Sequence, residues 1–175
     1  GGHFSIAPNG KFHSEQNYVS NTNVLVTKFY CDDGSEFQVT DFCPRFEQHG
    51  RVYRPISIFR IVEPLRGAPS IKVACKPVNG WEKTAVKPMR GNSHIRFDVG
   101  GDILRLVTNM SLTYLTEETT FLVRERLYFG LTWSTGVEDD LADVTKQFLV
   151  KTIDYWRTWV KHCSIPAQYQ KETIR

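Results

Sequence analysis

The 175-residue chain lacks any apolar run close to the roughly 20 residues that a membrane-spanning helix requires. Its first residues also lack the basic start and apolar stretch of a secretory signal. Net charge is only +3, and the 22 basic and 19 acidic residues are well mixed along the chain. Nucleic-acid-binding domains carry a concentrated basic surface instead. The composition therefore predicts a protein with neither a membrane nor a nucleic-acid partner.

Cysteine motifs are absent as well. None of the four cysteines belongs to a C-x-x-C pair, and no histidine lies at zinc-finger spacing from them. Cys31, Cys43 and Cys75 occur inside apolar strand patterns, so we expect them to be buried free thiols. Free thiols favour a reducing compartment. The sequence thus predicts a cytoplasmic protein without a metal site.

The common catalytic signatures are also missing. The chain has no nucleophile elbow, phosphate-binding loop, dinucleotide-binding glycine pattern or zinc-protease motif. Two carboxylate clusters remain, at 117–118 and 138–140, and paired carboxylates can hydrolyse a glycosidic bond. We interpret the first cluster as part of a turn and the second as the negatively charged start of a helix. The sequence therefore predicts no catalytic residue and no cofactor in this chain.

The sequence does contain a series of short strand patterns. Alternating or β-branched apolar runs recur through the first three quarters of the chain, with turn residues between them and no helical pattern interleaved. These runs cover residues 4–6, 23–31, 36–43, 56–62, 70–75, 94–99, 103–108 and 121–133. The strongest signal is a hairpin through the Asp33-Gly34 turn, after which Phe37, Val39 and Asp41 share one face. This pattern predicts an antiparallel β-sandwich.

After Gly136 the apolar period becomes that of a helix. Asp139 and Asp140 are suitable N-caps, and basic residues occupy the expected last turn. The pattern predicts one amphipathic helix over about residues 140–162, about 33 Å long, which is longer than a sandwich edge needs. One side of this helix carries an aromatic stripe, which we expect to contact another domain: Tyr155, Trp156 and Trp159.

Two irregular segments hold the candidate substrate-binding residues Trp81, Arg45 and Arg51. Trp81 follows a glycine in segment 77–81, where an aromatic ring can stack on a sugar. It can equally close one end of the sandwich, which is the commoner use because exposed large aromatics are rare. Arg45 and Arg51 belong to a predicted polar loop, 44–54, and can hydrogen-bond polyols or a carboxylate, although a solvated loop explains them too.

Three further segments have distinctive patterns. Residues 17–29 read Asn-Tyr-Val-Ser-Asn-Thr-Asn-Val-Leu-Val-Thr-Lys-Phe, residues 39–44 read Val-Thr-Asp-Phe-Cys-Pro, and residues 155–160 read Tyr-Trp-Arg-Thr-Trp-Val. In this order they resemble the Y-x-x-x-T-N-V-L-x-T-x-F strand, the V-T-D-F-x-P element and the W-x-x-W linker helix of one family. That family is the bacterial glycoside hydrolase family 15, the glucoamylase and trehalase-like group, and the resemblance is to its N-terminal domain.

The resemblance implies a supersandwich domain at 1–136, then at 137–175 a linker helix and the start of an (α/α)6 catalytic barrel. Residues 173–175 stand where that barrel begins. In the family the barrel carries two glutamates that hydrolyse α-glucosidic bonds with inversion, and neither has a counterpart in this chain. The family's opening D-G-x-I-D-W-L stretch is also missing and the chain starts Gly-Gly, so we expect a fragment.

The implied function is that of a non-catalytic domain that supports the barrel and its active-site rim. Its implied partners are the barrel itself and an α-glucan or trehalose. Two alternatives stay open from the residues alone. The chain can be a stand-alone carbohydrate-binding module that uses Trp81 and the loop arginines. It can also be a structural domain whose aromatic stripe pairs with a second copy as a homo-oligomer.

Overall fold

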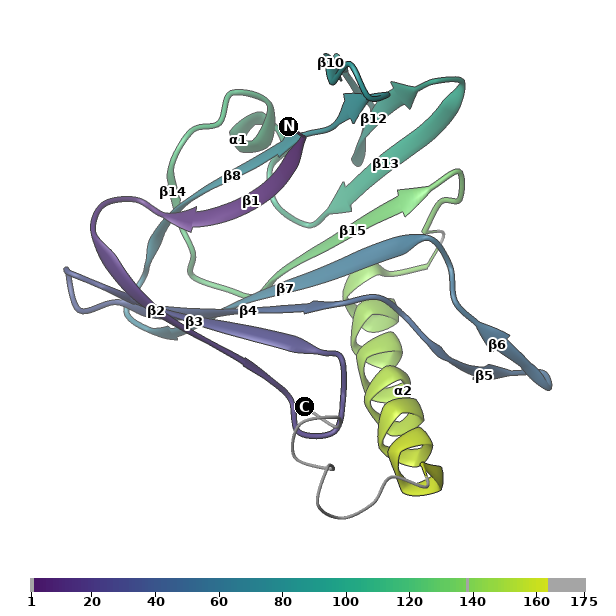
Figure 1. The fold of residues 1–175 in the computed structure, drawn as a ribbon. Helices are drawn as coiled ribbons and strands as arrows, with labels where there is room; N and C mark the ends of the chain where they lie inside the picture. Colours follow the sequence, from purple (N-terminus) through teal and green to yellow (C-terminus); the bar gives the residue numbers. More distant parts are fainter. Residues whose placement is uncertain (1, 138, 164–175) are drawn as a thin grey trace.

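The largest element of the computed structural model, which describes residues 2–137 and 139–163, is an eight-stranded antiparallel sheet (Figure 1). Its strand order is β11-β12-β13-β15-β7-β4-β3-β2. The strands are β2 (Phe12–Tyr18), β3 (Leu25–Cys31), β4 (Glu36–Phe42), β7 (Ser57–Arg66), β11 (Pro88–Arg90), β12 (His94–Val99), β13 (Asp102–Thr108) and β15 (Leu127–Trp133). Short hairpins project from this body: β5 (Phe46–Gln48) with β6 (Arg51–Tyr53), and β9 (Val78–Asn79) with β10 (Thr84–Ala85).

A three-stranded sheet forms the second layer. It consists of β8 (Ser70–Lys76) between β1 (His3–Pro8) and β14 (Phe121–Leu122), all antiparallel. Apolar side chains from both sheets form one buried cluster, which includes Ile71 and Val73 from the small sheet and Phe37, Phe97 and Phe129 from the large one. Burying a side chain of this size stabilises the fold by about 1.5–3 kcal/mol. The predicted antiparallel β-sandwich is confirmed.

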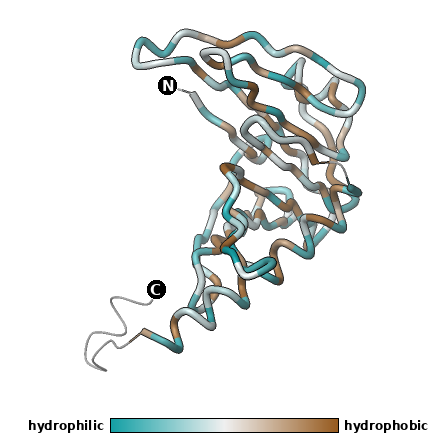
Figure 2. Tube along the Cα trace, turned by 90° about the vertical axis from the view of Figure 1, so that its right-hand side faces the viewer, coloured by the Kyte–Doolittle hydropathy of each residue, from teal (hydrophilic) through white to brown (hydrophobic). Residues whose placement is uncertain are grey.

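The long helix α2 (Leu141–His162) covers the opposite face of the large sheet. Its Phe148 and Ile153 pack against a second cluster that contains Phe42 and Phe59. Figure 2 shows the trace of α2 alternating between hydrophobic and hydrophilic residues, as expected for a helix with one side on a sheet. The central strands are therefore buried on both faces, which the sequence alone did not predict.

Glycine allows α2 to approach the sheet closely. Gly130 of β15 lies under the first turn of the helix, where an added Cβ would be 3.1 Å from the Phe59 ring and 3.5 Å from Leu141 Cδ1. The predicted helix is confirmed in extent and in its cap, because the Asp140 carboxylate accepts a hydrogen bond from the backbone N–H of Asp143.

The predicted hairpin between β3 and β4 is confirmed. The Asp33 carboxylate accepts hydrogen bonds from the backbone N–H and the hydroxyl of Ser35, and Gly34 has a φ of 80°. Phe37, Val39 and Asp41 share one face of β4, as predicted, and this face is directed into the sandwich. Asp41 is tolerated there because Arg60 donates hydrogen bonds of 2.7 and 3.0 Å to its two oxygens.

Several predictions about the strands were wrong. The run 121–133 is not one strand: β14 pairs in the small sheet and β15 in the large one. A short helix, α1 (Leu112–Thr116), interrupts the strand series and buries Leu112 and Leu115 in the sandwich core. The predicted strand 23–31 corresponds to β3, but the sequence pattern missed β2, which ends at Tyr18, and the turn at 19–24 that joins the two strands. The expected start of a catalytic barrel at 173–175 lies outside the described residues.

Candidate functional site

The segment 44–54, predicted to be a polar loop, forms the β5–β6 hairpin instead. Its two-residue turn is His49-Gly50, both with positive φ (51° and 71°), which suits a tight hairpin turn. The ring of Phe46 packs 5.3 Å from the ring of Phe148 on α2, and the ring of Tyr53 lies 5.6 Å from the same ring. Two features of the sequence indicate this hairpin: the His49-Gly50 pair and the alternating pattern that ends at Tyr53. The charged residues around both features favoured a loop instead.

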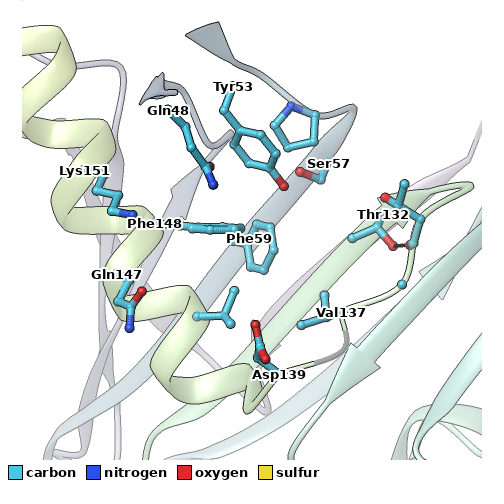
Figure 3. A pocket seen from close by; sticks show the side chains of 14 residues that line it. Gln48, Tyr53, Ser57, Phe59, Thr132, Val137, Asp139, Gln147, Phe148 and Lys151 are labelled. Atoms are coloured by element: carbon cyan, nitrogen blue, oxygen red, sulfur yellow. Dashed lines mark hydrogen bonds between the residues drawn. The ribbon is translucent and has the colours of Figure 1, made fainter. Parts of the chain in front are cut away.

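A concave surface of about 390 Å³, here called the polar cleft, lies between this hairpin, the sheet and the start of α2 (Figure 3). Phe59 and Phe148 form its apolar floor. Its walls carry polar groups from three regions of the chain: Gln48, Tyr53, Ser57, Thr135, Asp139, Gln147 and Lys151. Figure 3 shows the hydroxyls of Tyr53 and Ser57 directed toward one another on one side, with Asp139 and Gln147 across from them. The cleft thus combines aromatic surface with neutral and charged hydrogen-bonding groups.

One buried polar atom of the cleft has no hydrogen-bond partner among the described residues. Within the described part of the chain, the Ser57 hydroxyl oxygen is shielded from solvent and makes no hydrogen bond. A buried hydroxyl without a partner costs roughly 1–3 kcal/mol. The Thr132 hydroxyl, also buried, donates a hydrogen bond to the Thr135 carbonyl, whereas the remaining polar side chains of the cleft belong to exposed residues.

A second hollow, here called the aromatic groove, runs along the distal half of α2. It measures about 500 Å³ and is lined by Phe46, Glu47, Lys151, Asp154, Tyr155, Thr158, Trp159 and His162. The Arg45 guanidinium lies over the rings of Tyr155 and Trp156, at 5.4 and 5.5 Å from their centroids. The aromatic stripe is therefore partly covered by the chain's own arginine, whereas Trp159 keeps 49% of its surface exposed.

The three residues predicted to bind substrate do not meet in one place. Trp81 stands at the tip of the β9–β10 hairpin with 100% exposure, so the expectation that it closes the sandwich end is wrong. Arg45 is directed to α2, and Arg51 is exposed at the start of β6. Figure 1 places the β9–β10 and β5–β6 hairpins at separate ends of the molecule. The residues of the polar cleft were missed because they come from segments that only the tertiary fold brings together.

The carboxylate cluster at 117–118 has a structural role. Glu117 caps α1, and Glu118, at a φ of 52°, forms ion pairs with Lys76 and Lys72 of β8. Hydrogen bonds from Lys76 and Lys72 hold the pKa of Glu118 below its ordinary value of 4.5. The interpretation of this cluster as part of a turn is confirmed. No group of three or more His, Cys, Asp or Glu side chains in the described ranges lies close enough together to hold a metal ion.

The cysteines are free, as expected, but their predicted burial is wrong in part. Cys43 is exposed, and Cys31 and Cys75 are half-buried. Cys43 follows the end of β4, where the alternation no longer points into a core. Burial raises the pKa of the Cys75 thiol to about 12 against the opposing effect of Arg60.

Comparisons of the chain with protein-family models, curated proteins and solved structures found no match. No helix in the described ranges is both long and apolar enough to cross a membrane. The fold, the two hollows and the sequence resemblance are therefore the observations that bear on function.

Proposed function

We propose that this chain is the non-catalytic N-terminal β-sandwich domain of a cytoplasmic glycoside hydrolase of family 15, an enzyme that hydrolyses α-glucosidic bonds. The proposal rests on the incomplete coverage of α2 by the rest of the chain. The helix uses one side to cover the large sheet, yet at its distal end Trp159 remains half exposed beside a groove. An exposed tryptophan in an aromatic groove is typical of a surface that another domain covers.

The partner in this proposal is the helical catalytic domain of the same protein. The last of the sequence motifs that resemble the family lies in this same helix. The order of the motifs and the exposed aromatic groove therefore both support contact between α2 and that domain. The chain's role would be to hold α2 rigidly against the sandwich and so fix the position of the attached domain. Arg45 contributes by packing its guanidinium on Tyr155 and Trp156.

The proposal, which requires a catalytic domain beyond Arg175, is tested by comparing this chain with a longer one that includes that domain. Tryptophan quenching by acrylamide is measured for both in a Trp81→Phe background, because Trp81 is fully exposed. We expect Trp159 to be quenched strongly in the short chain and to be protected in the long one, with Trp159→Phe identifying its share. Equal quenching in both chains would refute the proposal.

Homo-oligomerisation through the same groove is a second candidate, favoured by the same exposed Trp159. Sedimentation equilibrium distinguishes homo-oligomerisation from contact with a catalytic domain. A concentration-dependent dimer that Trp159→Ala abolishes supports pairing between copies, and a monomer at high concentration excludes it.

A further inference from the structure

We propose that a pocket at one end of the sandwich binds a neutral, mainly apolar small molecule. This pocket, here called the apolar pocket, has a volume of about 460 Å³ and lies between β8, α1, β12 and the β9–β10 hairpin. Figure 1 shows β10, β12 and α1 together at the end of the molecule that is remote from the distal half of α2. The apolar pocket is therefore separate from the aromatic groove, and its ligand does not depend on the proposed function.

The apolar pocket continues the sandwich core to the surface. Its buried side is formed by Ile95, Phe97 and Leu115, which belong to the cluster between the two sheets. Partly buried Val86 and Cys75 pack against the same cluster and also line the pocket. Nearer to solvent, the lining consists of half-buried or exposed apolar residues that a ligand can contact: Pro77, Val78, Ala85 and Pro88.

The β9–β10 hairpin forms a wall with a defined position. Val78 and Ala85 are paired directly across the hairpin, so their side chains lie on one face, and both line the pocket. Glycines let the body of the protein approach this wall closely. An added Cβ at Gly2 would be 3.0 Å from the Val78 nitrogen, and one at Gly100 would be 3.2 Å from the Asn79 side-chain oxygen. The pocket is therefore formed before a ligand arrives, which lowers the cost of binding.

The polar groups of the lining favour a neutral ligand over an ion. The side chains of Lys76 and Glu118 form an ion pair with one another, and the Lys72 ammonium also lies 3.0 Å from the Glu118 carboxylate. A charged ligand would have to compete with these contacts and would lose its hydration in an apolar space. The Thr116 hydroxyl and the His3 imidazole also line the pocket and can hydrogen-bond a hydroxyl of the ligand.

The size and low polarity of the pocket suit an apolar ligand. Small-ligand sites usually measure roughly 300–1,000 Å³ and are lined mainly by apolar side chains with a few polar groups. Burial raises the pKa of the Cys75 thiol to about 12, which agrees with poor solvation on the β8 wall. Water in such a space finds few hydrogen-bond partners, so a ligand gains affinity by displacing it. A fused-ring aromatic alcohol combines the required apolar body with one hydroxyl.

The test is a titration of the ¹⁵N-labelled chain with 1-naphthol, followed by NMR. We expect saturable shifts centred on the backbone amides of Cys75, Val78 and Val86. 1-Naphthoate, which has a carboxylate in place of the hydroxyl, should bind at least about tenfold more weakly because its charge loses hydration. Ala85→Trp fills the pocket from an exposed position, and Val78→Asp adds a charge to its wall. Each variant should weaken the binding of 1-naphthol at least about tenfold.

Matched controls place the same side chains outside the lining of the apolar pocket. Ala68→Trp in the turn between β7 and β8, and Val52→Asp in β6, should leave the affinity for 1-naphthol unchanged. The NMR spectrum verifies that each variant is folded, and Ala85→Trp decides alone if Val78→Asp disrupts the hairpin.

Four results would overturn the inference: shifts that do not saturate with 1-naphthol, equal or tighter binding of 1-naphthoate, full affinity in Ala85→Trp, or shifts centred on Trp159 or Trp133. None of them affects the quenching test of Trp159, so this inference and the proposed function can fail separately.

Discussion

The backbone N–H of Arg45 donates a hydrogen bond of 3.1 Å to the hydroxyl of Thr152, a fully buried side chain in the middle of α2. This bond joins the segment between β4 and β5 to the helix that covers the large sheet, across 107 residues of sequence. It fixes the position of the β5–β6 hairpin against α2. Both the polar cleft and the aromatic groove lie beside this junction, so its stability decides whether either hollow keeps its shape.

Replacing Thr152 with valine should destabilise the fold by about 1–2 kcal/mol, because the shape is kept while the Arg45 N–H loses its acceptor. Urea unfolding followed by far-UV circular dichroism measures the change. Thr145→Val on the same helix is the matched control. Thr145 is also fully buried, but its hydroxyl has no partner within the described residues, so the control should be neutral or slightly stabilising. Equal effects at the two positions would contradict the account of the junction.

The pair formed by Arg60 and Asp41 should matter more than any exposed ion pair. Arg60 binds both oxygens of Asp41 and also donates a hydrogen bond of 2.7 Å to the Phe4 carbonyl, which holds β1. Arg60→Met should cost about 3 kcal/mol in the free energy of unfolding, because a mostly buried carboxylate is left unpaired.

Arg66→Met provides the comparison for Arg60. The Arg66 side chain is 74% exposed and lies 3.7 Å from Glu36, so its loss should cost less than about 1 kcal/mol. Similar losses of stability in the two variants would show that the Arg60 pair does not anchor β1.

Glu118 should make stability depend on pH. Its folded pKa is lowered by Lys76 and Lys72, so its stabilising effect is present above the ordinary value of 4.5 and is lost as pH falls through the folded pKa. The difference in unfolding free energy between the natural chain and Glu118→Gln should therefore be largest near neutral pH and shrink under acidic conditions. A difference that stays constant across this range would contradict the assignment.

Thiol reactivity should distinguish Cys43 from Cys75. Partial burial and the charge of Asp41 raise the pKa of the Cys43 thiol too, but Cys43 is exposed, whereas the pKa of half-buried Cys75 is raised to about 12, and the thiolate is the reactive form. Mass spectrometry after limited alkylation of the folded protein should find Cys43 modified well before Cys75. In urea the two should react at similar rates, and a faster reaction of Cys75 in the folded protein would refute this ranking.

The sequence predicted the elements whose pattern is local. The β3–β4 hairpin and the span and cap of α2 both follow from residues close in the chain, and both are confirmed. It did not predict where 121–133 divides between two sheets, because both parts are apolar and only packing separates Leu122 from Leu127. The polar cleft could not be predicted from the sequence for the same reason, because Ser57 and Gln147 line one cleft only when α2 packs on the sheet.

Sugar release by the purified chain is the most direct test of the claim that this domain supports catalysis without performing it. With maltose and trehalose as substrates, the account predicts no glucose above the rate of a buffer blank. Turnover at about 1 s⁻¹ or faster, which is ordinary for an enzyme, would contradict it, above all if Asp139→Asn abolished the activity.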